Sequence, residues 1–432
     1  MREQNRTIHT LDEQRGQMVT PESTSVSNPP AKRRSFLGYL ALMGPAFVVG
    51  AWQFGPGNLT TAVQAGSRFD YTLVWVIAVS TVLMIFFTDM SVRLGIATPT
   101  SLITSIKEHL GKWVGILAGF GVFGITLMFS VGNAVGSGLG LSLVFGGSPV
   151  LWTVVCTAAV AFVLAFKNVY GIVEKALLAI VVLMGIAFIA STVVAQPDWY
   201  RAMEGMVPQL PPGSEILIVA LVGTNFSINA AFYTSYGIKE NGRTRADYRD
   251  ITLVDTIPGI VAPGIMTALV IMVAASVLGK TGAEAGTINA LASVFTPLAG
   301  PVGSMLFALG LSGAAFSSMI ANATAGGTML SDALGRGAKA GSVAARIVTG
   351  LILAFGLVIT LSFQSSPVGL IVIAQSLTVL IAPLLGILIV MMANKRSVMG
   401  DLRNRWWHNL FAAVGLVAII ASSLRLITTL LG

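Results

Sequence analysis

The tetrad Gly55-Pro56-Gly57-Asn58 places a helix breaker and a carboxamide inside a long apolar segment. Proline lacks the amide donor of a helix and clashes with the preceding turn, and glycine leaves the backbone free on either side. Irregular backbone at membrane depth is tolerated only where it is buried in protein or lines a cavity. We therefore predict a helix broken near mid-membrane, where secondary transporters bind substrate; a proline kink without a ligand is the alternative.

A second polar cluster interrupts another apolar run and consists of Gly223, Thr224, Asn225, Phe226, Ser227, Ile228 and Asn229. Its hydroxyl and carboxamide groups can bond to backbone groups that a break sets free, so we predict a second broken helix here. No proline marks this position, and hydrogen bonding between packed helices is the alternative explanation.

The elements that must position the two breaks are long apolar helices. Of the 432 residues, 54% are hydrophobic and 10% are charged, whereas a soluble domain carries roughly 25% charged residues. Runs long enough to cross a bilayer, about 20 residues each, occur at approximately 36–66, 71–92, 114–144, 150–166, 172–195, 216–238, 252–279, 302–330, 347–363, 368–392 and 410–431. We predict an all-α membrane protein with eleven transmembrane helices.

The basic residues indicate how the chain is oriented. The net charge is +8, and 22 of the 26 Lys and Arg residues fall on one side when the loops alternate from a cytoplasmic N-terminus; the others are Arg68, Arg201, Lys280 and Arg425. By the positive-inside rule, this predicts a cytoplasmic N-terminus and an external C-terminus. The same distribution explains the positive charge without a nucleic-acid partner, and the expected surroundings are the lipid bilayer.

Outside the apolar runs the sequence offers little chemistry. Residues 1–34 are polar and predict a disordered cytoplasmic tail, not a cleaved signal peptide, so that 35–432 form one transmembrane domain. The single cysteine, Cys156, lies in the fourth run and cannot form an intrachain disulfide. The motifs HExxH, GxSxG, CxxC and the P-loop do not occur in the sequence, so we expect neither an enzyme nor a cofactor.

The spacing of the breaks indicates internal symmetry. They lie in the first and sixth runs, and an offset of five spans makes the two units cross the membrane in opposite directions. This is the LeuT-like inverted repeat of five plus five helices, in which broken helices 1 and 6 meet at the midplane. We place the repeats at about 36–196 and 214–393, with an extra helix at 405–431.

Four segments of the chain carry a family resemblance. They are GPAFVVGAWQFGPGNLTTAVQAGSRF, VWVIAVSTVLMIFFTDMSVRLGIAT, LFALGLSGAAFSSMIANATAGGTML and AQSLTVLIAPLLGILIVMMANKRSVMGDLRN. In order and spacing they resemble divalent-metal transporters of the natural resistance-associated macrophage protein (NRAMP) type. The resemblance implies a secondary transporter that works by alternating access, and we expect it in the bacterial inner membrane.

The residues that the family uses to hold its metal are largely replaced. The family motif Asp-Pro-Gly-Asn has Gly55 in place of the aspartate, and the family motif Met-Pro-His reads Ser227, Ile228 and Asn229 here. Gln375 matches a glutamine that the family uses near the metal. The resemblance therefore indicates a divergent member that lacks the usual metal ligands.

Ion coupling has few candidate groups in this sequence. An Asp and a Glu on the family's proton route align with Ser130 and Asn133, so both carboxylates are missing. We name as candidates for ion coupling Asp89, Asp255, Asn229, Asn133 and Ser130. An intramembrane carboxylate suggests function, but for Asp89 a pairing with Arg93, four residues further along the helix, is the structural alternative.

The predicted substrate contacts are Gly55, Asn58, Thr224, Ser227 and Gln375, and the predicted helix-break residues are Pro56, Gly57, Gly223 and Asn225. Four of these residues, Asn58, Thr224, Ser227 and Gln375, are our candidate metal ligands. A neutral site with oxygen ligands favours a hard ion such as Mg²⁺ or Mn²⁺ over Fe²⁺. The alternatives are a carrier of the same fold for a small carboxylate-bearing solute, because half-helix N-termini attract anions, and a non-transporting sensor.

Overall fold

The computed structural model is helical in all regular elements of the part it describes, residues 42, 44–166, 182–183, 185–279, 286–296 and 300–431. The predicted tail at 1–34 and part of the predicted fifth span lie outside these residues. The described helices all belong to one compact unit, Leu40–Gly432.

The first half of the chain contains α3 (Pro45–Gln53), α4 (Pro56–Phe69), α5 (Val74–Ala97), α6 (Leu102–Leu110), α7 (Lys112–Phe145), α8 (Pro149–Ala165), a helix at Gly185–Ala195 and α10 (Trp199–Glu204). Proline stands in the first turn of α3, α4 and α8. Its missing amide costs no hydrogen bond at that position. The chain therefore starts a new helix at Pro56 directly after the break.

The second half contains α11 (Glu215–Asn225), α12 (Ile228–Glu240), η1 (Arg245–Asp247), α13 (Tyr248–Ile251), the π-helix η2 (Thr252–Thr256), α14 (Ile257–Val277) and α15 (Ile288–Ser293). They are followed by α17 (Pro301–Ala333), α18 (Val343–Ser362), α19 (Pro367–Thr378), α20 (Ala382–Asn394), α21 (Arg396–Met399), η3 (Gly400–Leu402) and α22 (Trp406–Leu431).

The predicted spans agree with the observed helices. Eight stretches of the described residues are long and apolar enough to cross a membrane, and they coincide with the predicted second, third and sixth to eleventh spans. Two shorter apolar helices, Pro149–Ala165 and Gly185–Ala195, lie in the predicted fourth and fifth spans. The predicted first span contains α3 and α4, which have 9 and 14 residues and are each too short to cross alone.

Both predicted breaks are present, and two further irregularities were not predicted. Span one is interrupted between Gln53 and Pro56, and span six between Asn225 and Ile228. Span ten is also interrupted, between α19 and α20, and span seven begins with the π-helix η2. Pro383 in the first turn of α20 is the signal for the break in span ten, because proline is readily accepted only where a helix begins.

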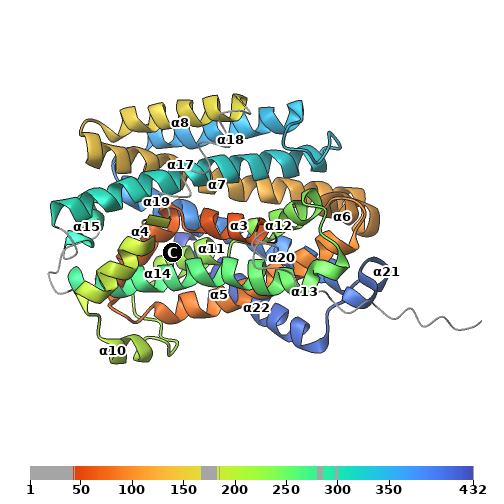
Figure 1. Cartoon of the computed structure of the whole chain (residues 1–432), viewed down its shortest axis with the longest axis horizontal. Coiled ribbons are helices and arrows are strands. Elements are labelled where there is room, and N and C mark those ends of the chain that lie inside the picture. The colour runs from red at the N-terminus through yellow and green to blue at the C-terminus, as the bar shows by residue number, and fades with distance from the viewer. Residues whose placement is uncertain are drawn as a thin grey trace, which may run out of the picture. The chain divides into compact units, whose positions relative to one another are not determined.

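The helix packing follows the predicted two-fold relation. The C-terminal half of span one, α4, packs against span seven, α14, and correspondingly the C-terminal half of span six, α12, packs against span two, α5. Spans three and eight, α7 and α17, form the most extensive helix pair. Figure 1 shows α8, α18, α17 and α7 gathered above α4, α14 and α5. The proposed repeat bounds of 36–196 and 214–393 stay a prediction.

The buried apolar side chains form two clusters on either side of the breaks. Trp52, the residue before the end of α3, belongs to one cluster and is 3% exposed, whereas Phe54 belongs to the other and is 4% exposed. The first break therefore lies at the boundary between two apolar regions, which supply a low-dielectric surrounding for the polar groups there.

Basic side chains predicted to lie on the cytoplasmic side bind neighbouring loops of that side. The contacts are Lys107 with Asp332 O, Lys239 with Thr98 O, Lys395 with His109 O, and Arg245 with Asp401. On the predicted outer side, Arg201 pairs with Asp70 and Arg425 with Glu215. These contacts agree with the alternation of loops inferred from the sequence.

Candidate functional site

The two breaks meet at Asn58, which lies in the first turn of α4. Its Nδ2 donates to Thr267 Oγ1 at 2.9 Å, and its Oδ1 accepts from Thr224 Oγ1 at 3.4 Å. Asn58 and Thr224 are each 1% exposed, and Thr267 is fully buried. The structure thus brings together two predicted site residues, one from each broken span, in the protein interior.

Thr267 comes from α14 and was missed by the sequence analysis. Its hydroxyl donates to Pro263 O at 2.7 Å, so its oxygen accepts the Asn58 amide. Thr267 is the single hydroxyl-bearing residue between Ile257 and Ala275, which is a signal that the sequence did carry. Because Thr267 holds the amide nitrogen, the Asn58 oxygen faces Thr224 across a contact longer than an ordinary hydroxyl hydrogen bond, and it retains capacity for a ligand.

Gly55 lies where span one approaches α7 and α17. A Cβ added at Gly55 would lie 2.8 Å from Ser318 Oγ, 3.3 Å from Trp52 O and 3.5 Å from Asn133 Oδ1. The Ser318 hydroxyl donates to Trp52 O at 3.0 Å, which satisfies one of the carbonyls at the end of α3. A side chain at position 55 would therefore project toward Ser318 and toward Asn133, which is one of the predicted ion-coupling residues.

The Gln375 side chain of α19 packs against glycines of two other spans. A Cβ added at Gly57 would lie 2.5 Å from Gln375 Cδ, and one added at Gly132 would lie 2.6 Å from Gln375 Nε2. Gln375 is fully buried, and within the described part of the chain neither Nε2 nor Oε1 has a hydrogen-bond partner. Such burial is costly for a carboxamide, so its oxygen is suited to binding a ligand or water at the first break.

Ser227 and Asn229 bond to each other. Ser227 Oγ donates to Asn229 Oδ1 at 2.8 Å, and neither is hydrogen-bonded to Asn58 among the described contacts. Asn229 Nδ2 is buried without a partner from the described residues. Asn229 and Thr378 supply the polar groups of a cavity of ≈ 10 Å³ beside the second break, which is room for about one water molecule.

Two of the predicted helix-break residues hold the end of α11 in place. Asn225 Nδ2 donates to Ser80 Oγ at 2.7 Å and to Thr81 Oγ1 at 2.9 Å, which ties α11 to α5. A Cβ added at Gly223 would lie 2.5 Å from Gln375 O, so α11 and α19 approach closely there. The absence of a side chain at Gly223 therefore brings the breaks of spans six and ten together.

The side chains assembled at the breaks are uncharged. They are hydroxyl and carboxamide groups, from Asn58, Thr224, Thr267, Ser318, Asn133 and Gln375. In the described residues there is no group of three or more His, Cys, Asp or Glu side chains that could hold a metal. The arrangement offers neutral oxygen ligands, which suit a hard cation that keeps part of its water shell.

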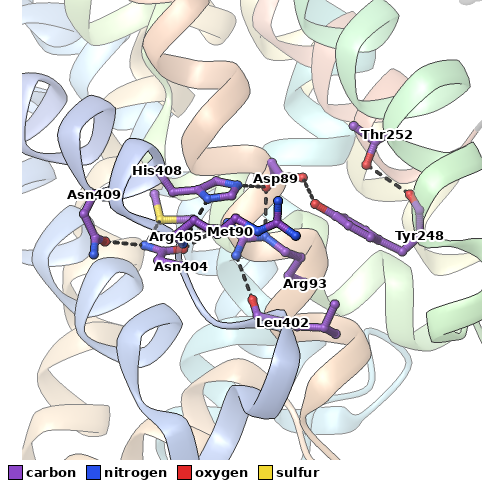
Figure 2. A network of polar contacts seen from close by, with 10 residues as sticks. All are labelled: Asp89, Met90, Arg93, Tyr248, Thr252, Leu402, Asn404, Arg405, His408 and Asn409. Carbon is purple, nitrogen blue, oxygen red and sulfur yellow. Dashed lines mark hydrogen bonds and ion pairs between the residues drawn. The ribbon is translucent and has the colours of Figure 1, made fainter.

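Asp89 lies in a separate polar network near the C-terminal end of α5. Asp89 Oδ2 accepts from Arg93 Nε at 2.9 Å, and Tyr248 OH donates to Asp89 Oδ1 at 2.8 Å (Figure 2). His408 Nε2 lies 3.8 Å from the same carboxylate. The pairing of Asp89 with Arg93, which the sequence left as an alternative, is therefore present, and it joins α5 to α13 and α22.

Arg93 extends this network to the chain between spans ten and eleven. Its two remaining nitrogens donate to Leu402 O at 2.7 Å and to Asn404 Oδ1 at 3.0 Å. The side chains of Arg93 and Asp89 are 3% and 10% exposed. A buried pair with this many hydrogen bonds holds elements together, since removal of either partner leaves an uncompensated charge.

Asp255 also lies away from Asn58, and Ser130 faces α18, where a Cβ added at Gly356 would lie 2.8 Å from Ser130 Oγ. Asp255, in η2, accepts from Gly44 N at 2.9 Å and from Ala46 N at 3.0 Å, so its carboxylate caps the start of α3. The nine residues of α3 separate this cap from the break by about 14 Å. Ser130 donates to Leu127 O at 2.8 Å within α7.

Comparisons with known proteins identify the family to which the chain belongs. A family model described as natural resistance-associated macrophage protein-like matches residues 46–429. The divalent metal cation transporter MntH of Deinococcus radiodurans is 28% identical over 410 residues, 91% of this chain and 91% of that protein. The relative of the same name in Bacillus subtilis is 28% identical and covers 94% of this chain and 97% of its own length.

Two solved structures show the same fold. A mutant of the Eremococcus coleocola manganese transporter superposes with a TM-score of 0.76 at 17% identity, covering 93% of this chain and 88% of that one. MhsT in complex with L-phenylalanine superposes with a TM-score of 0.56 at 18% identity, covering 88% of this chain and 98% of that one. The all-helical inverted-repeat fold predicted from the sequence is thereby confirmed.

Proposed function

Because the chain belongs to the natural resistance-associated macrophage protein-like family of membrane transporters, we propose that it moves a divalent metal cation across the membrane by alternating access. The relatives that it matches along nine-tenths of their length are named divalent metal cation transporters. We therefore expect the site to bind a transported ion and not to catalyse a reaction.

The contact between Asn58 and Thr224 carries this proposal. It joins spans one and six at their breaks, and both oxygens are buried. Helix ends at a break expose main-chain carbonyls without intrahelical partners. A cation between the two spans would receive ligands from both halves of the repeat, so its binding would be sensitive to their relative movement.

The transported ion that fits these ligands is a hard one, Mg²⁺ or Mn²⁺. The donors are the carboxamide oxygens of Asn58 and Gln375 and the hydroxyl of Thr224, while Ser227 occupies the position of a family methionine. Thioether sulfur favours softer ions such as Fe²⁺, and oxygen favours hard ions. We propose that the cation binds partly hydrated, because a neutral site does not fully offset the cost of dehydrating a dication.

A small carboxylate-bearing solute is the competing cargo. The small cavity that Asn229 lines has no room for it, and a larger cavity between α5, α11 and α22 faces away from Asn58. The cavity beside the second break measures ≈ 10 Å³, whereas pockets for organic ligands measure about 300–1,000 Å³. Asn229 faces this small cavity. We therefore assign to Asn229 a water associated with the ion rather than an organic group.

We further propose that proton coupling, where it operates, does not use the ligands themselves. Asn58, Thr224 and Gln375 do not titrate near neutral pH, and Asn133 and Ser130 stand where the family has carboxylates. Asp89 and Asp255 remain the ionisable candidates, acting through the networks that hold α5 and α3. We place the protein in a bacterial plasma membrane with its N-terminus in the cytoplasm, in accord with its basic loops.

Uptake into proteoliposomes tests the proposed function. The native protein is expected to take up Mg²⁺ or Mn²⁺, and Asn58→Ala is expected to abolish uptake because it removes the only side chain that bridges Thr224 and Thr267 in the described site. Asn241→Ala, in an exposed loop, is the matched control and should transport normally. Normal flux in Asn58→Ala, or no flux of either metal in the native protein, would overturn the proposal.

A further inference from the structure

A cavity of ≈ 500 Å³ lies between α5, α11 and α22, apart from the ion site. On α11 and its C-cap residue Phe226 it is lined by Glu215, Ile218, Val219, Val222 and Phe226, which form one stripe at helical spacing. With 3.6 residues per turn, Thr224 lies about 180° around α11 from this stripe. The cavity therefore contacts the face of α11 that points away from Asn58.

Small side chains on α22 create the cavity. The α22 stripe that faces it consists of Ala418, Ala421, Ser422 and Arg425, again three or four residues apart. The other face of α22 carries large apolar side chains such as Ile420, which is 39% exposed and suited to contact with lipid. Larger residues on this stripe would fill the space between α22, α5 and α11. Ala418, Ala421 and Ser422 are small and leave that space open.

The rim of the cavity carries one charge of each sign. Arg425 Nη2 and Glu215 Oε1 lie 2.8 Å apart, and their side chains are 58% and 29% exposed. Both residues belong to the predicted outer side. Trp75 also lines the cavity and donates from Nε1 to Gln209 O at 3.1 Å, an arrangement typical of aromatic residues at the membrane interface.

We propose that this cavity binds a zwitterionic phospholipid of the outer leaflet, with one acyl chain inside and the headgroup at the rim. The walls are mostly apolar and the volume lies in the range of about 300–1,000 Å³ typical of ligand sites. Water would find few polar partners in the cavity body. Arg425 matches the lipid phosphate and Glu215 matches a primary ammonium group, so the pair complements phosphatidylethanolamine.

The bound chain would brace the second break. Val222 and Phe226 line both this cavity and the small cavity beside Asn229, so they form the wall between the two. Phe226 also contacts Phe87 edge to face, with ring centroids 5.0 Å apart. An acyl chain against this wall would hold the end of α11 in the position observed here, and would thereby link lipid binding to the conformation of span six.

Lipid binding can be measured directly, without a transported ion. A negative result in this assay would therefore refute the lipid site and would leave the proposed transport function untouched. Delipidated protein is titrated with phosphatidylethanolamine, and bound lipid is counted by native mass spectrometry. Ala421→Phe, which fills the cavity, is expected to weaken binding at least tenfold, and Ala421→Leu to weaken it less. Ile420→Phe, on the opposite, lipid-facing side of α22, is the matched control and should bind as the native protein does.

The headgroup assignment is tested by exchanging the charges and the lipid. Glu215→Gln is expected to weaken binding of phosphatidylethanolamine severalfold and to leave phosphatidylglycerol, which has no ammonium group, nearly unaffected. Circular dichroism and gel filtration establish that each variant is folded. Unchanged binding in folded Ala421→Phe and Ala421→Leu would overturn the cavity as a lipid site, and equal affinity of the native protein for the two lipids would overturn the headgroup assignment.

Discussion

Restoring a carboxylate at the first break is the sharpest test of how charge governs this site. In Gly55→Asp the new Cβ would meet Ser318 Oγ at 2.8 Å, so the Ser318 side chain must rotate. Rotation gives up its hydrogen bond to Trp52 O, at a cost of about 1 kcal/mol, but it lets the hydroxyl donate to the new carboxylate. The substitution therefore needs one rotamer change and a small shift of the backbone away from Trp52 O, which would lie 3.3 Å from the new Cβ.

The expected gain in metal affinity follows from the charges. A dication and a carboxylate 4 Å apart attract by about 8 kcal/mol at an effective dielectric constant of 20. The ion and the carboxylate must both give up water to make this contact, which costs several kcal/mol. The displacement of Ser318 is already present in the ion-free variant, so it lowers the stability of the protein and not its affinity for the ion. The net gain is about 1.4–2.8 kcal/mol, which corresponds to a roughly 10- to 100-fold lower dissociation constant for Mn²⁺.

Isothermal titration of the detergent-solubilised protein with Mn²⁺ measures this change. Gly55→Asn has the same shape without the charge and is the matched control, so it should not gain affinity. Equal Mn²⁺ affinities for Gly55→Asp and Gly55→Asn would refute the electrostatic argument. Weaker binding in Gly55→Asp than in the native protein would show that position 55 does not face the ion.

Three further substitutions probe groups around the site. Thr267→Val leaves the Asn58 amide without its acceptor, and the loss of about 1–3 kcal/mol should weaken ion binding roughly 5- to 150-fold, with unchanged titration contradicting this role. Arg93→Ala strands the buried Asp89 carboxylate and should lower the free energy of unfolding by about 3–5 kcal/mol; a loss below 1 kcal/mol would mean that water solvates the carboxylate. Asp255→Asn weakens the cap of α3, so amide exchange in α3 should rise roughly tenfold or more, and identical exchange would count against the cap.

The neutral site also has a consequence for selectivity. The candidate ligands are the oxygens of Asn58, Thr224, Ser227 and Gln375. Ser227 uses its proton to donate to Asn229, so its oxygen keeps its lone pairs. None of these ligands is soft, so discrimination between Mg²⁺ and Mn²⁺ would depend on how many waters each ion retains. Mg²⁺ dehydrates reluctantly, and a site that accepts a hydrated ion therefore suits it.

The sequence alone determined the features that depend on local covalent properties and on hydrophobicity. The break at Pro56 could be predicted because proline cannot continue a helix at that point. The positions of the apolar spans followed from segment length, and the alternation of loops followed from the distribution of Lys and Arg. Even the inverted repeat could be inferred, because an odd offset between two breaks sets their relative direction.

Only the tertiary structure decided which side chains meet. Helices buried on most sides are apolar all round, so their sequences do not encode the rotation that turns Thr267 toward Asn58 or Ser318 toward Gly55. For the same reason the sequence does not reveal that Ser227 donates to Asn229, or that Asp89 is held by Tyr248 as well as Arg93. Partners about 200 residues apart, such as Asn58 and Thr267, are selected by helix packing, which local patterns in the sequence do not specify.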